Sequence, residues 1–236
     1  MTDTSKGELR RQIAIVAKFP FYINDIRSRL SDLDIQIVSA SEISQIQNQI
    51  ENGESFDVIF FPHYSKIVPD DFLEVNNCVG FHTGDLPNDR GGTPIQNKIL
   101  RGEYNTRVSA IKLTKELDAG DILCSEPISI ENGTIEQILK EISSLIAGLV
   151  RIVMTENPIP VPQNKHTQLS TRLNPEASEL NIDSLSVKQI YDRIRMLDGL
   201  DYPPAYIQFD RYRILLSNAK LQNNHLTFVS QLEEKK

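Results

Sequence analysis

The chain has 236 residues, 39% of them hydrophobic, which is enough to bury one main core and a small second one. Its formal net charge of −7 argues against a protein whose chief partner is DNA or tRNA, because binding to a polyanion needs clustered Lys and Arg. The two cysteines indicate no disulfide framework or metal site, and no apolar run is long enough for a signal peptide or a bilayer span, so we expect a soluble, cytoplasmic protein.

Short apolar runs alternate with amphipathic stretches through most of the chain. The runs are rich in β-branched residues, as buried strands are, and the stretches between them have the spacing of helices. Strands that alternate with helices predict an α/β fold with a mostly parallel, helix-covered sheet, whose ligands bind beyond the carboxyl ends of the strands. The predicted strands cover residues 12–17, 35–39, 57–61, 78–82 and 107–112, and the predicted helices cover residues 24–33, 42–51, 94–101 and 136–154.

A proline-rich stretch, NPIPVPQNKH, then interrupts this pattern and cannot continue the preceding helix. Beyond it, Ser186 and Gln189 have the spacing of a capping box and predict the start of another helix. The predicted organisation is a first domain over residues 1–156, a linker over 157–167 and a small α+β appendage over 168–236, with a helix over 186–197 and strands over 205–210, 212–217, 219–221 and 226–230.

Two residues in the middle of the chain are candidates for chemistry. His82 ends a predicted buried strand and precedes a polar, glycine-rich loop, and Asp118 lies in a second acidic turn. A lone histidine after an apolar run is more often a structural residue, and an aspartate near glycine is more often a turn residue. A carboxylate and an imidazole on neighbouring loops can, however, share the proton of an attacking amine. Both interpretations stay open at this point.

Three motifs occur around these residues in a characteristic order: HTGDLP, RGGTPIQ and LDAGDIL. With this order and spacing the chain resembles the formyltransferase family that uses 10-formyltetrahydrofolate, over roughly its first two-thirds. The resemblance implies a Rossmann-like catalytic domain, 10-formyltetrahydrofolate as the formyl donor, no metal, and His82 and Asp118 as the catalytic pair. It also implies that residues 60–69 and the turn 116–121 form the two walls of a folate pocket.

The resemblance assigns further residues to binding. Those implied in folate binding are Phe61, His63, Tyr64, Ser65, Ile67, Leu117, Ala119, Gly120 and Asp121. Those implied in binding the formyl acceptor are Thr83, Asp85, Arg90, Gly91, Gly92 and Thr93.

One position departs from the family pattern. The family usually has an asparagine two residues before the histidine, and this chain has Gly80 there, which has no side-chain amide to hold the formyl oxygen. Asn97, near the start of the following helix, is a candidate third catalytic residue that supplies the missing amide, or else an exposed helix residue. Gly84 stands where the family commonly has serine, and both changes are expected of a sugar-modifying subfamily.

The tail bears on the choice of acceptor. The methionyl-tRNA formyltransferases of the family are longer and have a basic carboxyl-terminal domain, whereas this tail is short and ends in acidic residues. It resembles the tail of sugar N-formyltransferases, which implies a nucleotide-linked 4-amino-4,6-dideoxy sugar of a surface-glycan or pseudaminic acid pathway as acceptor, and no nucleic acid or membrane partner. Pairing of the tail strands across a two-fold axis predicts a homodimer.

Three tail residues are candidates for contacting such a sugar nucleotide. Arg193 and Arg195 have guanidinium groups that suit a diphosphate, and Tyr202 suits stacking on a base. The alternative is that these are exposed helix residues and packing residues. Two other functions also remain open: a formyltetrahydrofolate hydrolase, and a catalytically impaired folate-binding protein.

Overall fold

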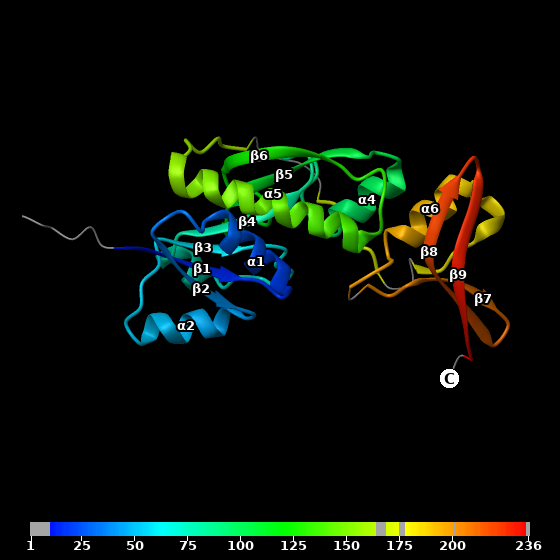
Figure 1. Ribbon diagram of the computed structural model, residues 1–236, viewed down its shortest axis with the longest axis horizontal. Helices are drawn as coiled ribbons and strands as arrows, with labels where there is room; N and C mark the ends of the chain where they lie inside the picture. Colours follow the sequence, from blue (N-terminus) through cyan, green and yellow to red (C-terminus); the bar gives the residue numbers. More distant parts are fainter. Residues whose placement is uncertain (1–9, 164–168, 175–177, 201, 235–236) are drawn as a thin grey trace, which may run out of the picture. The chain divides into compact units, whose positions relative to one another are not determined.

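The computed structural model describes residues 10–163, 169–174, 178–200 and 202–234 (Figure 1). Contacts between Cα atoms divide the chain into two compact units, each made of three segments. Unit 1 comprises Met1–His82, Ser109–Ser125 and Ser143–Gln163, and unit 2 comprises Thr83–Val108, Glu126–Ile142 and Asn164–Lys236.

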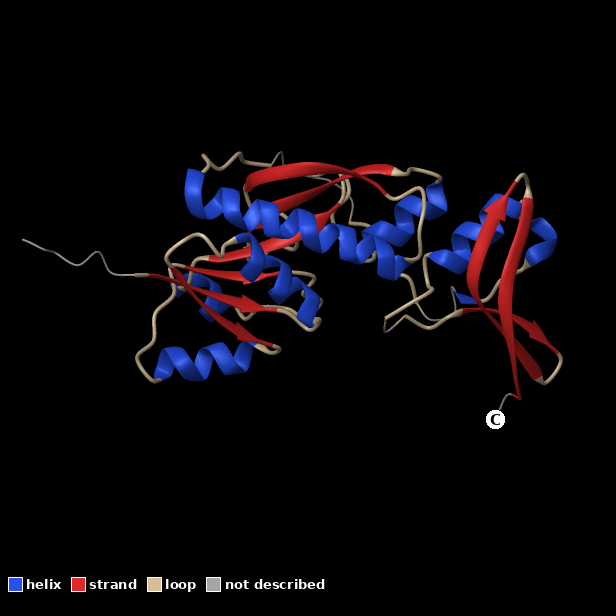
Figure 2. Ribbon diagram, viewed as in Figure 1, coloured by secondary structure: helices blue, strands red, loops and turns tan. Residues whose placement is uncertain are grey.

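The first sheet has six strands (Figure 2). They are β1 (Arg11–Val16), β2 (Ile35–Ala40), β3 (Val58–Phe61), β4 (Cys78–Thr83), β5 (Asn105–Lys112) and β6 (Ile122–Ser129). The strand order is β2-β1-β3-β4-β5-β6, and β1 pairs in parallel with β2 and β3, as β3 does with β4. The helices between them are α1 (Pro20–Arg29), α2 (Ile43–Glu51), α3 (Asp70–Val75) and α4 (Pro94–Arg101), and α5 (Ile135–Glu156) follows β6. The predicted α/β fold with a mostly parallel sheet is confirmed.

Both faces of the parallel strands are covered. Ala14 and Val16 of β1 belong to a buried cluster with Ile46 of α2 and Phe72 of α3. Successive strand residues point to opposite faces, so Ile13 and Ile15 point away from this cluster, and they are fully buried as well. A strand buried on both faces needs apolar residues at every position, which explains the continuous apolar runs seen in the sequence.

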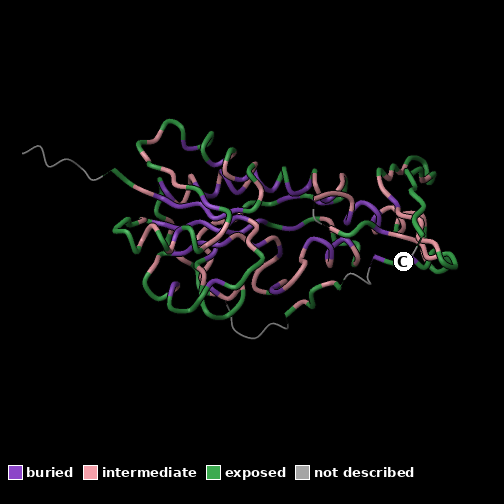
Figure 3. Tube along the Cα trace, turned by 90° about the horizontal axis from the view of Figure 1, so that it is seen from below, coloured by how far each residue is buried: buried purple, intermediate pink, exposed green. Residues whose placement is uncertain are grey.

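The end of the chain forms a second, antiparallel sheet. It contains β7 (Ala205–Phe209), β8 (Tyr212–Gln222) and β9 (His225–Glu234), in that order, and α6 (Val187–Arg195) precedes it. Ala205 and Leu216, which pair across β7 and β8, are buried, whereas β9 is exposed along nearly its whole length. Figure 3 shows the buried trace running along the strands of the first sheet and the end of the chain mostly exposed. The predicted α+β appendage is confirmed, and the predicted homodimer stays a prediction.

Several predicted boundaries differ from the structure for identifiable reasons. Helix α1 begins at Pro20, a favoured first helical residue, and α3 has only six residues, too few to show a periodic pattern. The strands predicted over 212–217 and 219–221 are one strand, β8, with a register shift between Ser217 and Lys220, because a β-bulge interrupts the alternating pattern without ending the strand. The predicted capping box of α6 is present.

The predicted linker is not simply a connection. Its residues 164–168 lie outside the described part of the chain, but the residues before them belong to unit 1. Val161 and Ile122 exchange both backbone hydrogen bonds, at 2.8 and 2.9 Å, in an isolated antiparallel bridge. The predicted domain limits themselves stay a prediction. No helix in the described residues has the length and apolar character needed to span a bilayer.

Candidate active site

Two histidines lie at the carboxyl ends of neighbouring strands of the first sheet: His82 is within β4 and His63 follows β3. Phe61 of β3 pairs with Gly80 of β4, and two residues beyond this pair come His63 and His82. Since β3 and β4 are parallel, both histidines lie at the carboxyl end of the sheet, where α/β proteins bind ligands. The structure therefore places His82 where the sequence predicted it.

The imidazole of His82 faces the carboxylate of Asp118. His82 Nδ1 lies 3.3 Å from Asp118 Oδ2, and the exposed fractions of the two side chains are 5% and 17%. A carboxylate at Nδ1 favours the ring with its proton on that nitrogen and turns Nε2 away from Asp118. This arrangement, with the base oriented by a partly buried carboxylate, is the one that general acid–base catalysis uses. The predicted pair is thus brought together within unit 1.

The turn that carries Asp118 is held in an unusual backbone conformation. Asp118 has φ +53°, in the left-handed region that aspartate tolerates better than most residues. Gly120 lies so close to β5 that a Cβ built on it would be 1.7 Å from the carbonyl oxygen of Lys112. The neighbouring Asp121 accepts a hydrogen bond from Lys112 N at 3.0 Å. The turn is therefore pressed against the end of β5, and only glycine fits at position 120.

Gly80, where the family pattern has asparagine, is also tightly enclosed. A Cβ on Gly80 would lie 2.5 Å from Cδ2 of Leu113, so the Leu113 side chain occupies the space that a side chain at position 80 would need. Leu113 is itself fixed by its backbone, since its N–H donates to Cys78 O at 2.9 Å. Apolar packing therefore stands where the family has an amide side chain. In the same strand, burial raises the pKa of the Cys78 thiol to about 12.

An aromatic cluster surrounds His63, in the predicted folate wall. Its ring stacks on Tyr22 with centroids 5.9 Å apart and lies 6.0 Å from the ring of Phe19, which stacks on Phe21. Burial lowers the pKa of His63 to about 4, and the charge of Lys18 adds to this. His63 is therefore a neutral imidazole at neutral pH, and it offers a flat surface beside the carboxyl ends of β1 and β3.

This lowered pKa predicts a pH-dependent stability. The unfolded chain binds a proton at His63 near pH 6.5, but the folded state binds it only near pH 4. The stability that neutral His63 contributes is therefore complete above pH 6.5 and is lost as the pH falls towards 4. We expect His63→Asn, which tolerates positive φ and does not titrate, to remove about 1–3 kcal/mol of this dependence, as measured by urea unfolding at several pH values. Equal pH dependence in both proteins would contradict the prediction.

Other residues of the predicted folate walls differ in exposure. Phe61 is buried in the core, where its ring packs against Tyr64, and its binding role stays a prediction. Ile67 and Leu117 are 91% and 55% exposed. Binding roles for Tyr64, Ser65, Ile67, Leu117, Ala119, Gly120 and Asp121 stay predictions.

The glycine-rich loop after β4 holds another segment of its own unit. Gly91 forms a parallel bridge with Ser170, whose carbonyl also accepts from Gly92 N at 3.1 Å, and Thr93 Oγ1 accepts from Leu173 N at 3.0 Å. A Cβ on Gly91 would lie 2.5 Å from Ser170 O. The glycines are therefore explained by close packing against residues 170–173, and the acceptor contacts predicted for this loop, Thr83 included, stay predictions.

Asn97 and the charged residues nearby are engaged in the same structure. Asn97 Nδ2 donates to Gly92 O at 3.0 Å and to Thr171 O at 3.1 Å, which uses both amide hydrogens. The predicted catalytic role of Asn97 is thus unsupported. Asp85 binds Lys98 Nζ at 2.7 Å, and Arg90 is buried.

Arg195 requires a correction. Its side chain is 1% exposed, donates from Nε to Asp192 at 2.6 Å and from Nη1 to Gly133 O at 3.1 Å, and lies over the ring of Tyr191. A guanidinium buried in this way holds α6 in place and does not bind a diphosphate. Asp192 and Tyr191 are on α6 itself, but the carbonyl of Gly133 is 62 residues away in the sequence, and this distant contact could not be predicted from the helix pattern. Arg193 and Tyr202 are partly exposed, and no contact assigns them a ligand.

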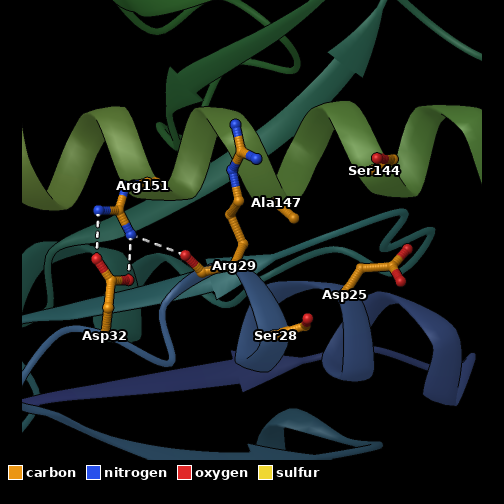
Figure 4. A pocket seen from close by; sticks show the side chains of 7 residues that line it. All are labelled: Asp25, Ser28, Arg29, Asp32, Ser144, Ala147 and Arg151. Atoms are coloured by element: carbon orange, nitrogen blue, oxygen red, sulfur yellow. Dashed lines mark hydrogen bonds and ion pairs between the residues drawn. The ribbon is translucent and has the colours of Figure 1, made fainter.

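A separate hollow of about 420 Å³ lies between α1 and α5, away from every residue predicted for the site (Figure 4). At one end of it, Arg151 makes two hydrogen bonds to Asp32, at 2.6 and 2.7 Å, and one to Arg29 O at 2.9 Å. The bond to Arg151 lowers the pKa of Asp32 to about 2. Two arginines and two aspartates line the hollow, so their formal charges balance. Among the described residues, no group of three or more His, Cys, Asp or Glu is placed to hold a metal ion.

Comparison with known proteins identifies the family. Residues 35–150 match the family model described as formyl transferase, and residues 175–230 match the one described as methionyl-tRNA formyltransferase, C-terminal domain. The solved structure of a methionyl-tRNA formyltransferase from Clostridium thermocellum is 31% identical, with a TM-score of 0.87 over 95% of this chain and 99% of that one. The chain belongs to the formyltransferase family. Membership confirms that the protein is a formyltransferase and that 10-formyltetrahydrofolate is the formyl donor.

Curated relatives agree with this assignment. The methionyl-tRNA formyltransferase of Mycoplasmopsis pulmonis is 28% identical over 211 residues, which cover 86% of this chain and 72% of that protein. The chain spans a smaller share, 63%, of the methionyl-tRNA formyltransferase of Mesoplasma florum.

The expected nucleotide-sugar acceptor is wrong. A sugar N-formyltransferase from Shewanella sp. FDAARGOS_354 covers 96% of this chain but is only 14% identical, with a TM-score of 0.68, and so shares the fold alone. The tail matches the methionyl-tRNA formyltransferase model instead. Three expectations that depended on the sugar acceptor are therefore wrong as well: the surface-glycan pathway, the diphosphate and base contacts, and the absence of a nucleic acid partner. Net charge misled because it sums over the whole chain and says nothing about one local surface.

Proposed function

We propose that the protein transfers the formyl group of 10-formyltetrahydrofolate to the amino group of methionyl-tRNA. The observation that carries the proposal is the similarity to the Clostridium thermocellum methionyl-tRNA formyltransferase over nearly the full length of both chains, tail included. The match of residues 175–230 to the carboxyl-terminal domain of such enzymes supports the same acceptor.

The residues present fit a folate donor. The pterin and aminobenzoyl groups of folate are flat, and the rings of Phe19 and His63 offer flat surfaces beside the carboxyl ends of β1 and β3. The turn 116–121 offers backbone groups for the polar edge of the pterin. The bound donor supplies the formyl carbon that the amine attacks.

The chemical work of the chain falls to His82 and Asp118. Asp118 orients the ring through Nδ1, so Nε2 is the nitrogen that takes the proton of the attacking amine or donates to the formyl oxygen as negative charge develops there. Leu113 fills the place of the usual asparagine side chain, so this stabilisation depends more heavily on His82.

The test is an acceptor comparison with the purified protein. It is incubated with 10-formyltetrahydrofolate and methionyl-tRNA, and the amino acid released from the tRNA is examined by mass spectrometry for one added formyl group. N-acetylmethionyl-tRNA, whose amine is blocked, is the matched control, and a reaction without acceptor measures formate release. We expect formylation of methionyl-tRNA alone. Formate release without any formylated product would replace the proposal with a hydrolase.

A further inference from the structure

We infer that Gln163 is a positioning residue for the catalytic pair, acting from the proline-rich segment 157–163 on the turn that carries Asp118. The inference rests on the proposed transfer reaction, because it assigns Gln163 a part in orienting His82. It adds to the motif residues a group that lies more than forty positions after Asp118 in the sequence.

The segment that carries Gln163 is rich in prolines. Prolines occupy positions 158, 160 and 162, and Ile159 and Val161, which each precede a proline, favour extended backbone. Val161, between two prolines, exchanges both backbone hydrogen bonds with Ile122, the first residue of β6. The antiparallel bridge sets the register of the segment, and two residues along it Gln163 comes opposite Gly120.

From this position the side chain of Gln163 binds two carbonyls of the catalytic turn. Its Nε2 donates to Asp118 O at 2.9 Å and to Gly120 O at 2.6 Å. Both partners are acceptors, so the amide must present its nitrogen to them, and the side chain is partly buried. One amide thus connects the carbonyl of the catalytic aspartate to that of the glycine that contacts β5.

These bonds act where the turn most needs support. Asp118 holds a left-handed backbone, which persists only where neighbouring contacts enforce it. On one side the turn meets Lys112 of β5, and on the other it meets Gln163. The backbone conformation of Asp118 sets the direction of its carboxylate, and Oδ2 of that carboxylate lies 3.3 Å from His82 Nδ1. Releasing Gln163 therefore loosens the carboxylate that orients the imidazole.

The test replaces the donor without changing the shape of the side chain. Gln163→Glu puts carboxylate oxygen where the nitrogen faced two carbonyls, and we expect kcat to fall ~10–100-fold with little change in KM for the folate donor, as a misplaced catalytic group typically causes. The matched control is Gln208→Glu, because Gln208 Nε2 also donates to two backbone carbonyls, those of Asp210 and Tyr212, in the turn between β7 and β8. We expect the control to keep its kcat.

A spectroscopic measurement separates positioning from general damage. Proton NMR of the folded protein follows the Nδ1 proton of His82, which is hydrogen-bonded to Asp118. In Gln163→Glu we expect this resonance to move upfield or to broaden. An unchanged resonance, or a loss of kcat no larger than in Gln208→Glu, would overturn the inference. If Gln163→Glu does not fold, Gln163→Met, which keeps the length of the side chain and has no amide group, is measured in its place. Failure of the wild-type protein to formylate methionyl-tRNA would count against the proposed function, and the NMR result would still decide the role of Gln163.

Discussion

Replacing His82 with alanine lowers kcat for formyl transfer by roughly 10²–10⁴ and leaves binding of the folate donor intact, because one positioned acid–base group contributes about that much to the rate. His82 is buried against Asp118 at the carboxyl end of β4, and its side chain is the imidazole that the turn around Asp118 orients. Steady-state kinetics give kcat and KM, and equilibrium titration with folate gives the binding constant. Circular dichroism verifies that the variant is folded.

The matched control for His82 is His225→Ala, the same substitution at an exposed position of β9. It is expected to keep wild-type kcat. Turnover by His82→Ala within a few-fold of the wild type would remove the histidine from the mechanism. A loss of folate binding equal to the loss of kcat would instead make it a binding residue.

Gly120→Ala is expected to have the second large effect. A Cβ at this position would lie 1.7 Å from Lys112 O, so the backbone of the turn must move away from β5, and Asp118 two residues earlier moves with it. A displacement of about 1 Å at a catalytic group costs on the order of 10²-fold in rate, and the overpacking destabilises folding by about 1–3 kcal/mol. Kinetics and urea unfolding measure the two effects.

Gly148→Ala provides the control for the second variant. Gly148 lies within α5, where an added Cβ meets nothing nearer than Arg29 Nη2 at 4.0 Å, so the same chemical change is expected to stabilise the helix by roughly 0.5–1 kcal/mol. Activity of Gly120→Ala equal to that of Gly148→Ala would show that the contact with Lys112 does not hold the turn.

Local patterns were sufficient where a neighbour in the sequence determines the outcome. The capping box of Ser186 and Gln189, the helix start at Pro94 and the continuous apolar runs of the parallel strands were all predicted and are present. His82 was placed correctly because the end of a buried parallel strand is a site that sequence patterns reveal. Composition was a poorer guide, because the net charge and the short acidic tail led to the wrong prediction of a nucleotide-sugar acceptor.

Sequence alone therefore determined the fold class and the family, and it singled out His82 and Asp118, since these results depend on periodicity and on motifs of a few adjacent residues. Only the tertiary structure showed that Leu113 fills the space beside Gly80, that Arg195 is buried and that Asn97 binds Gly92 and Thr171. It also showed that Gln163, in the predicted linker, donates a hydrogen bond to the backbone carbonyl of Asp118. Each of these results depends on atoms that are distant in sequence and meet only after the strands and helices have packed, so no local pattern records them.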